Sequence, residues 1–303
     1  MKMIDVSIII VNYKSSSLVN DCIRSVFEKT EGILYEIIVV DNATENLSQV
    51  LDAYSDERVT TLQLKENVGF GRANNAGAKL AKGRNLFLLN PDTILINNAI
   101  KILSDYLDSH PKVGACGGNL FDRNMVPTSS YRRFFPGMFW EIDDFALNKL
   151  ESVFYRNPIF NSTDRVLNVK YVVGAALLIR RTDFFDLNGF CPEFFMYFEE
   201  TDLCNRVIRE LNKRNVNIPQ AQILHLEGGT TGEDSSYIFV PKKFELWEHG
   251  RRIFLQRNCS KLIVITANFI LRLNLFIKSM LLPSKKGRDV YRRSLRIHLA
   301  EWK

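Results

Sequence analysis

Three acidic residues stand close together in an aromatic stretch of the sequence. Glu199, Glu200 and Asp202 lie in FFMYFEETDLCNR, residues 194–206. Acids are costly to bury among aromatic rings unless they have a partner or a task. We expect a helix to begin near Thr201, and a helix N-terminus favours the ionised carboxylate, which helps it to act as a general base. The structural alternative is a capped helix with a solvated acidic first turn.

A second candidate site combines a carboxylate with an imidazole. Asp92 follows a predicted strand in NPDT, residues 90–93, and His225 ends another predicted strand before the glycine-containing loop EGGTT. Mg²⁺ and Mn²⁺ bind through one or two carboxylates together with substrate phosphate oxygens, so one aspartate can suffice. A neutral imidazole can serve as a further ligand. An Asx turn and a structural histidine are the alternatives.

Other polar residues have types and positions suited to a nucleotide. Asp41 ends the predicted strand YEIIVVDN, where its carboxylate can accept a hydrogen bond from a base N–H or a ribose hydroxyl. A turn or a helix-capping aspartate is the alternative. The stretch NVGFGRANNAG, residues 67–77, adds glycines and a run of amides that opens a helix. The candidate nucleotide contacts are Asn12, Tyr13, Asp41, Asn42, Gly71, Arg72, Asn74, Asn75 and Asn90.

These residues need a sheet whose strands end at one edge. Between residues 6 and 120 short β-branched runs alternate with amphipathic stretches, which is typical of βαβ units and of an α/β fold with a mostly parallel sheet. Strands are predicted at VSIIIVNY, YEIIVVDN, RVTTLQL, NLFLLN, VGACGGNL and VKYVVGAALLIRR, and helices at 18–28, 74–81 and 99–109. Ligands bind beyond the carboxyl ends of such strands, where the polar residues gather.

The bulk composition limits the architecture. With 303 residues, of which 46% are hydrophobic, the chain suits one large α/β domain with a helical appendage, and we predict a boundary between 1–260 and 261–303. The five cysteines are widely spaced, which indicates reduced thiols in a cytosolic protein. The opening residues predict a buried strand and not a signal peptide. A dinucleotide-binding loop with a third glycine would follow the first strand, but VNYKSSS stands there.

The C-terminal region is both apolar and basic. Residues 262–282 have nearly the length of a bilayer crossing, but Asn268, Arg272, Asn274 and Lys278 interrupt them. We therefore predict an amphipathic helix that lies on the membrane surface, with a helix buried in the core as the alternative. Much of the net charge of +6 follows it, which favours an anionic membrane over nucleic acid, at Lys285, Lys286, Arg288, Arg292, Arg293 and Arg296.

The motifs taken in order resemble a known family. VSIIIVNY, VVDN, NVGFGRANNAG, LNPDT, GAALLIRR, NGFCPEFFMYFEETDLCNR and HLEGG, within residues 4–260, resemble the family 2 glycosyltransferases of GT-A fold, above all the bacterial rhamnosyltransferase-like branch. The resemblance implies that Asp41 contacts the donor base, that Asn90 and Asp92 occupy the DxD metal motif, and that Glu200 occupies the catalytic position. Asn90 departs from the first acid of that motif. Glu200 departs from the usual aspartate, so Glu199 and Asp202 stay open as the base.

The resemblance also implies an activity. It is inverting transfer of a sugar, rhamnose foremost, from a nucleoside-diphosphate sugar to a saccharide or lipid-linked saccharide in cell-surface polysaccharide synthesis. Mg²⁺ or Mn²⁺, held by Asp92 and His225, is the expected cofactor, and the inner face of the plasma membrane is the expected location. One alternative is a sugar nucleotidyltransferase, although VNYKSSS lacks the glycine- and lysine-rich loop it needs. The other is a non-catalytic, membrane-attached sugar-nucleotide-binding protein.

Overall fold

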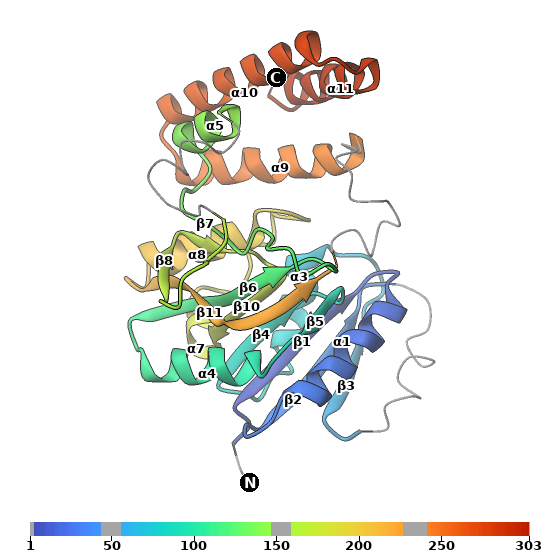
Figure 1. Cartoon of the computed structure of the whole chain (residues 1–303), viewed down its shortest axis with the longest axis vertical. Coiled ribbons are helices and arrows are strands. Elements are labelled where there is room, and N and C mark those ends of the chain that lie inside the picture. Colours follow the sequence, from blue (N-terminus) through green and yellow to red (C-terminus); the bar gives the residue numbers. More distant parts are fainter. Residues whose placement is uncertain (1–2, 44–55, 147–158, 227–240, 303) are drawn as a thin grey trace.

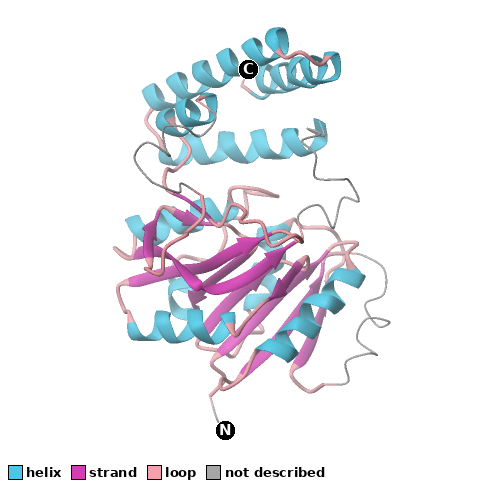
Figure 2. Ribbon diagram, viewed as in Figure 1, coloured by secondary structure: helices cyan, strands magenta, loops and turns pink. Residues whose placement is uncertain are grey.

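The structure has two layers. It is a computed structural model that describes residues 3–43, 56–146, 159–226 and 241–302. The larger layer is a twisted sheet with helices on both faces, and the smaller is a layer of helices at the end of the molecule opposite the N-terminus (Figures 1 and 2). The predicted α/β fold with a C-terminal helical extension is confirmed.

The sheet has nine strands in the order β3-β2-β1-β4-β10-β6-β11-β5, and β8 pairs with β11. Because β10, β5 and β8 alone run against the others, the sheet is mostly parallel, as predicted. A separate two-stranded sheet joins β7 and β9. The bounds are β1 Val6–Asn12, β2 Tyr35–Asp41, β3 Val59–Gln63, β4 Asn85–Leu89, β5 Thr93–Leu95, β6 Val113–Phe121, β7 Tyr131–Arg132, β8 Leu167–Val169, β9 Tyr171–Val172, β10 Ala176–Arg180 and β11 Arg214–His225.

Two apolar cores lie on the two faces of this sheet. Successive side chains of a strand point to opposite faces, so Ile8 and Ile10 of β1 join one core while Ile9 and Val11 join the other. The first core is closed by α1 (Ser16–Lys29) and α4 (Ala99–Ser109), and the second by α3 (Phe70–Ala78), α7 (Arg181–Asp186) and α8 (Glu199–Arg209). Burial on both faces explains why β1, β2 and β4 are continuously apolar.

Three predicted elements differ from the observed ones. The helix expected at 74–81 starts at Phe70, because Gly69 adopts a φ of +87° that turns the chain into the helix early. The single strand expected in VKYVVGAALLIRR is divided into β9 and β10, because β9 leaves the main sheet to pair with β7. The helix expected near Thr201 begins at Glu199.

The helical layer contains α5 (Met138–Phe145), α9 (Pro241–Asn258), α10 (Lys261–Leu281) and α11 (Lys285–Glu301). Its small apolar core consists of Phe244, Leu271 and Leu275. On the other side, α9 packs against the sheet layer through Phe254, which contacts Phe198 at a ring-centroid distance of 6.3 Å. The division of the chain at residue 260 stays a prediction, and the helical layer also contains α5 and α9.

A cluster of buried charged side chains holds the helical layer together. Arg251 of α9 is fully buried, and its Nε donates to Glu141 Oε1 of α5 at 2.6 Å. Its second nitrogen donates to Glu248 Oε1 at 3.2 Å and to Asn268 Oδ1 of α10 at 2.9 Å. The ring of His298 on α11 lies 2.7 Å from the same Glu248 oxygen. Four helices therefore meet at one ionic centre, which we name the Arg251 cluster: Arg251, Glu141, Glu248, Asn268 and His298.

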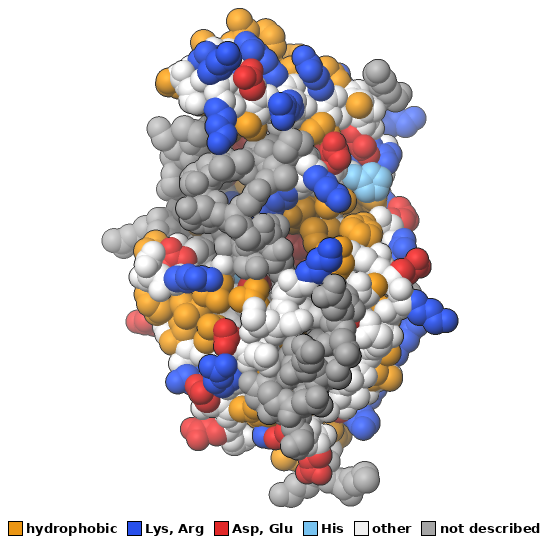
Figure 3. All heavy atoms as spheres, turned by 90° about the vertical axis from the view of Figure 1, so that its right-hand side faces the viewer, with side chains coloured by type: hydrophobic (Ala, Val, Ile, Leu, Met, Phe, Trp, Pro, Cys, Tyr) orange, Lys and Arg blue, Asp and Glu red, His pale blue; other side chains and the backbone are white. Residues whose placement is uncertain are grey.

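The outward face of α10 is apolar. The residues of this face recur three or four positions apart and are all at least two-fifths exposed, and we name them the apolar stripe: Leu262, Ile265, Phe269, Leu273, Phe276 and Met280. Basic side chains of α11 lie in the same layer, and Figure 3 shows hydrophobic and Lys or Arg side chains side by side at the top of the molecule. Only a third of the most apolar part of α10 is buried.

Candidate active site

The strand order brings the ends of β2, β1 and β4 together at one edge of the sheet. Asn12 pairs in register with Asp41, and Asn90 directly follows β4 on the other side of β1. Residues separated by up to about eighty positions in the sequence thus share one edge, as the sequence predicted for a parallel sheet.

Asp41 is held firmly at this edge. Its side chain is fully buried, accepting from Asn12 Nδ2 at 3.0 Å and from Gln63 Nε2 at 2.6 Å. Asn12 Oδ1 in turn accepts from the backbone N–H and hydroxyl of Ser15. Tyr13, beside them, is 39% exposed. Gln63 was not among the predicted residues. Its signal was its place at the end of β3, in register with Asp41.

The loop of residues 67–72, here the donor loop, is attached at both ends. Asn42 donates to Asn67 Oδ1 at 2.8 Å and accepts from the Val68 N–H at 2.9 Å. Phe70 N–H donates to the Phe195 carbonyl at 3.0 Å, and a Cβ on Gly69 would lie 2.2 Å from that oxygen. Only glycine therefore permits the donor loop to lie against the acidic stretch that contains Glu199 and Glu200.

The remaining predicted nucleotide contacts that lie in α3 make contacts with other parts of the protein. Asn75 Nδ2 donates to the Phe190 carbonyl at 2.8 Å, and its Oδ1 accepts from the Phe190 N–H at 2.9 Å. Asn74 is buried and donates to the Phe70 carbonyl within α3. Arg72 is exposed and donates from Nε to the Pro192 carbonyl. Gly71 packs closely on Phe190, where a Cβ would lie 3.1 Å from the Phe190 Cβ. Asn75 and Gly71 thus fix the donor loop to the segment before α8.

Asp92 and His225 lie together although 133 positions separate them in the numbering. Asp92 Oδ1 is 3.5 Å from His225 Nε2, because β5 pairs with β11 and places Thr93 opposite His225. The Leu226 N–H also donates to the Asp92 carbonyl at 2.8 Å. The sequence analysis predicted Asp92 and His225 as metal ligands from their residue types, without showing that they are close in space. The structure shows that the two side chains are neighbours.

The residues around this pair fit a hard divalent cation. Asn90 Oδ1 is buried and accepts no hydrogen bond from any residue in the described ranges, so its oxygen is available to a ligand at this end of β4. Carboxylate and amide oxygens suit Mg²⁺ and Mn²⁺. Within those same ranges no three His, Cys, Asp or Glu side chains form a cluster, so further ligands would have to come from substrate phosphate and water.

Glu199 and Glu200 lie side by side at the start of α8, where Glu199 is buried and Glu200 is half-buried. Burial raises the pKa of Glu200 above the ordinary range. Burial, followed by the charge of Glu200, raises the pKa of Glu199 still further. Glu200 packs against Gly174, where a Cβ would lie 3.3 Å from the Glu200 Cβ. Glu199 is 6% exposed and faces the donor loop, whereas Glu200 is only partly buried by surface area, so Glu200 is the more accessible of the two.

Asp202, the third acid, is paired within the helix. Its Oδ2 accepts from Arg206 Nε at 2.7 Å, and it is 1% exposed. Arg206 also donates to the carbonyls of Leu187 and Gly189, at 2.6 Å and 2.9 Å. This ion pair fastens α8 to the preceding turn, and it gives Asp202 a structural task.

The turn at residues 174–175 links the base candidate to the metal candidate. Glu200 lies against Gly174, and the carbonyl of the next residue, Ala175, accepts from the Asn90 N–H at 2.8 Å. A carboxylate that could take a proton and a carboxylate–imidazole pair that could hold a cation are therefore joined by one turn. This arrangement can deprotonate a hydroxyl beside a bound diphosphate.

Comparison with known proteins decides the family. The sequence profile of glycosyl transferase family 2 matches residues 7–200, about two thirds of the chain. This chain belongs to glycosyl transferase family 2. The match covers the donor loop, Asp92 and Glu200, so the resemblance found in the sequence is confirmed for the family and for its enzymatic class.

Relatives of this family 2 glycosyltransferase include rhamnosyltransferases. It is 25% identical over 236 residues to an N-acetylglucosaminyl-diphospho-decaprenol L-rhamnosyltransferase of Mycobacterium tuberculosis, covering 70% of this chain and 76% of that protein. It is 26% identical over 211 residues to the rhamnosyltransferase WbbL of Escherichia coli, covering 67% and 76%. The expected rhamnosyltransferase-like branch is thus confirmed.

A solved structure confirms the fold. The crystal structure of GalNAc-T7 with UDP, GalNAc and Mn²⁺ superposes with a TM-score of 0.63 at 14% identity, covering 99% of this chain. This chain spans 56% of the length of that structure. The comparison places the sheet layer among GT-A folds.

Proposed function

We propose that this glycosyltransferase moves a sugar, with rhamnose as the leading donor sugar, from a nucleoside-diphosphate sugar to a saccharide or lipid-linked saccharide, with inversion. The observation that supports this most is the turn at 174–175, which joins Glu200 to the edge holding Asn90, Asp92 and His225. The M. tuberculosis relative, whose name specifies L-rhamnosyl transfer to a diphosphate-linked saccharide, supports the choice of sugar and acceptor.

In this proposal Glu200 is the general base. Its carboxylate takes the proton of the acceptor hydroxyl while that oxygen bonds to the anomeric carbon and the bond to the nucleoside diphosphate breaks on the opposite side. The diphosphate leaves as an anion and needs no protonating acid, unlike the leaving group in glycoside hydrolysis. Asp202 is excluded from the role by its ion pair with Arg206.

The donor is held from three sides. Asp41, oriented by Asn12 and Gln63, accepts from the base or the ribose. Asp92 and His225, with the Asn90 amide oxygen, would hold Mg²⁺ or Mn²⁺, and the exposed Arg72 adds positive charge at the start of α3. A bound cation supplies charge that offsets the negative charge developing on the diphosphate.

The proposed location is the inner face of the plasma membrane, with α10 lying on its surface. By length and composition α10 is the one helix within the described ranges that could cross a bilayer, with a mean hydropathy of 1.5. Its opposite face is tied into the helical layer, however, since Asn268 binds Arg251 and Asn274 donates to Asp144 at 3.0 Å. A surface-lying helix keeps those contacts and still places the apolar stripe in lipid.

The decisive experiment is a donor panel. The purified protein is incubated with dTDP-rhamnose and UDP-sugars, with and without Mn²⁺ or Mg²⁺, and release of nucleoside diphosphate and the anomeric configuration of the product are measured. We expect metal-dependent release from one donor and an inverted product. Absence of turnover with every donor would favour the non-catalytic alternative, and formation of a nucleotide sugar from sugar phosphate and nucleoside triphosphate would favour the nucleotidyltransferase.

A further inference from the structure

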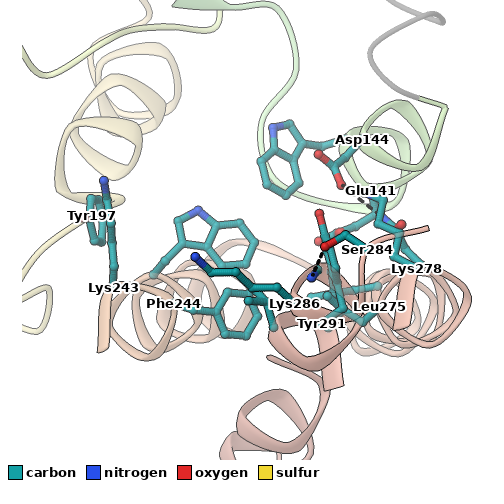
Figure 4. A pocket seen from close by; sticks show the side chains of 16 residues that line it. Glu141, Asp144, Tyr197, Lys243, Phe244, Leu275, Lys278, Ser284, Lys286 and Tyr291 are labelled. Carbon is teal, nitrogen blue, oxygen red and sulfur yellow. Dashed lines mark hydrogen bonds and ion pairs between the residues drawn. The ribbon is translucent and has the colours of Figure 1, made fainter. Parts of the chain in front are cut away.

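A cavity of about 650 Å³ lies between the helical layer and the acidic stretch (Figure 4). All four helices of that layer line it, and Tyr197 closes it on the side of the sheet layer. Tyr197 stands only three positions before Glu200. The cavity is thus separate from the sheet edge that holds Asp41, Asn90 and Asp92, here called the donor edge, but borders the segment that holds the proposed base.

The walls of the cavity are mainly aromatic. Trp247 stacks on Trp140 at a centroid distance of 5.8 Å and on Phe244 at 5.6 Å. It also contacts Phe198, at 5.6 Å, directly before Glu199. A row of rings therefore runs from the acidic stretch to α5, and such a surface suits an apolar chain.

Three lysines lie at this mainly apolar surface. Lys243, Lys278 and Lys286 all line the cavity, and Figure 4 shows Lys243 beside Tyr197 and Lys286 extended across the cavity. The acids among the lining residues are paired, since Glu141 binds Arg251 and Asp144 lies 3.9 Å from Lys278. Among the described residues, neither Lys243 nor Lys286 has a carboxylate partner. Lys243 and Lys286 thus bring two positive charges to the lining of the cavity.

The cavity also adjoins the proposed membrane-facing helix. Leu271 and Leu275 of α10 line it from one face of that helix, while the apolar stripe occupies the outward face. One helix thus contributes both to the wall of the cavity and to the surface proposed to meet the membrane.

We propose that this cavity binds the lipid-phosphate part of the acceptor: an apolar chain ending in a phosphate or diphosphate that carries the sugar. The aromatic row packs on the first units of the chain, Lys243 and Lys286 bind the phosphate oxygens, and the sugar extends past Tyr197 to Glu200. This inference rests on the proposed function and names the acceptor class of the same site.

The test uses the full-length protein and farnesyl diphosphate as the probe. Binding is followed by the fluorescence of Trp140 and Trp247, which line the cavity, and by calorimetry. We expect farnesyl diphosphate to bind at least about tenfold more tightly than farnesol, pyrophosphate or short-chain phosphatidylglycerol. Farnesol and pyrophosphate each supply only one part, and phosphatidylglycerol carries a singly charged phosphodiester in place of a terminal diphosphate. The double variant Lys243→Gln/Lys286→Gln should lose about tenfold in this affinity. The matched control, Lys242→Gln, changes an exposed neighbour outside the cavity and should lose nothing.

Donor turnover separates the two proposals. Release of nucleoside diphosphate to water should be unchanged in the double variant, because neither lysine lies at the donor edge. If the wild type turns over no donor, the proposed function fails, whatever binds in the cavity. If donor turnover is normal but farnesyl diphosphate binds no better than pyrophosphate, farnesol or phosphatidylglycerol, or binds equally in the double variant, this inference is wrong.

Discussion

The sheet layer and the helical layer bury opposite kinds of side chain. All seven residues of β1 are buried, and the sheet cores are built from Ile, Val, Leu and Phe. The helical layer fully buries Arg251, Glu248 and His298, while Leu262 and Phe269 are 71% and 65% exposed. In one layer apolar side chains face inward, and in the other many of them face outward.

The difference indicates two different surroundings. Removal of apolar surface from water stabilises the sheet layer, whose apolar side chains are mostly buried. The helical layer holds its ions by pairing, and it exposes a continuous apolar stripe, which is the kind of surface that typically takes part in protein or membrane contacts. Chemistry should therefore depend on the first layer, and attachment on the second.

The strongest test of this division is Glu200→Gln. The amide keeps the size of the side chain but takes no proton, so turnover should fall roughly 10²–10⁴-fold with donor affinity unchanged. In the wild type, burial raises the pKa of Glu200, so turnover should rise with pH through a range above that of an ordinary glutamate. Glu210→Gln, an exposed change at the end of the same helix, is the control. Near-normal turnover in Glu200→Gln would move the role to Glu199.

The Arg251 cluster offers the corresponding test in the helical layer. Arg251→Met leaves Glu141 and Glu248 buried without their cation, which should lower the free energy of unfolding by about 3–5 kcal/mol. Arg252→Met, which removes a partly exposed ion pair with Glu301, should cost about 1 kcal/mol or less. Urea denaturation measures both variants. Equal losses would mean that the buried cluster does not hold this layer together.

The pH dependence of stability isolates the same cluster. Burial raises the pKa of Glu141 to about 7, so the folded protein keeps a proton that the unfolded chain releases near pH 4.5. The proton on Glu141 therefore contributes to the free energy of unfolding in full below pH 4.5, and this contribution is lost as the pH rises through 7. The loss is at most about 3 kcal/mol. Urea midpoints from pH 5 to 8 should therefore fall more steeply for the wild type than for Glu141→Gln. Parallel curves would contradict the prediction.

The smallest effect on stability is expected at the apolar stripe. Phe269→Ser with Phe276→Ser should change the free energy of unfolding by no more than about 0.5 kcal/mol, because both rings are exposed. The same variant should no longer sediment with anionic vesicles. Leu80→Ser with Phe185→Ser, exposed apolar residues of the sheet layer, should sediment like the wild type. A wild-type protein that stays in the supernatant at low salt would disprove the membrane location.

Local sequence patterns predicted the strands and helices of the sheet layer well. Features that depend on which distant segments pair with one another could not be predicted from them. The helix 99–109 and the strands that end at Asn12 and Asp41 follow from periodicity and strand composition alone. Gln63 was missed because no local signal shows that β3 is the neighbour of β2.

In the helical layer, even more depends on contacts between segments that are far apart in the sequence. Arg251 and Glu248 look in sequence like the solvent-exposed charges of a helix, and Glu141 lies 110 positions away from Arg251. Their burial depends on how four helices pack, which composition does not specify. The start of α3 was also placed too late, at residue 74, because the sequence did not show that Gly69 turns the chain directly into the helix.

The strand order also sets the order in which the protein can fold during synthesis. β4 needs β10 as its neighbour, and β10 follows only at Ala176. At about 5–20 residues per second the ribosome leaves the apolar edge of β4 open for roughly 4–17 s, a period in which it could pair with another nascent chain. His225 is the last residue of the candidate site to be made, so every earlier intermediate lacks the imidazole of the candidate metal site.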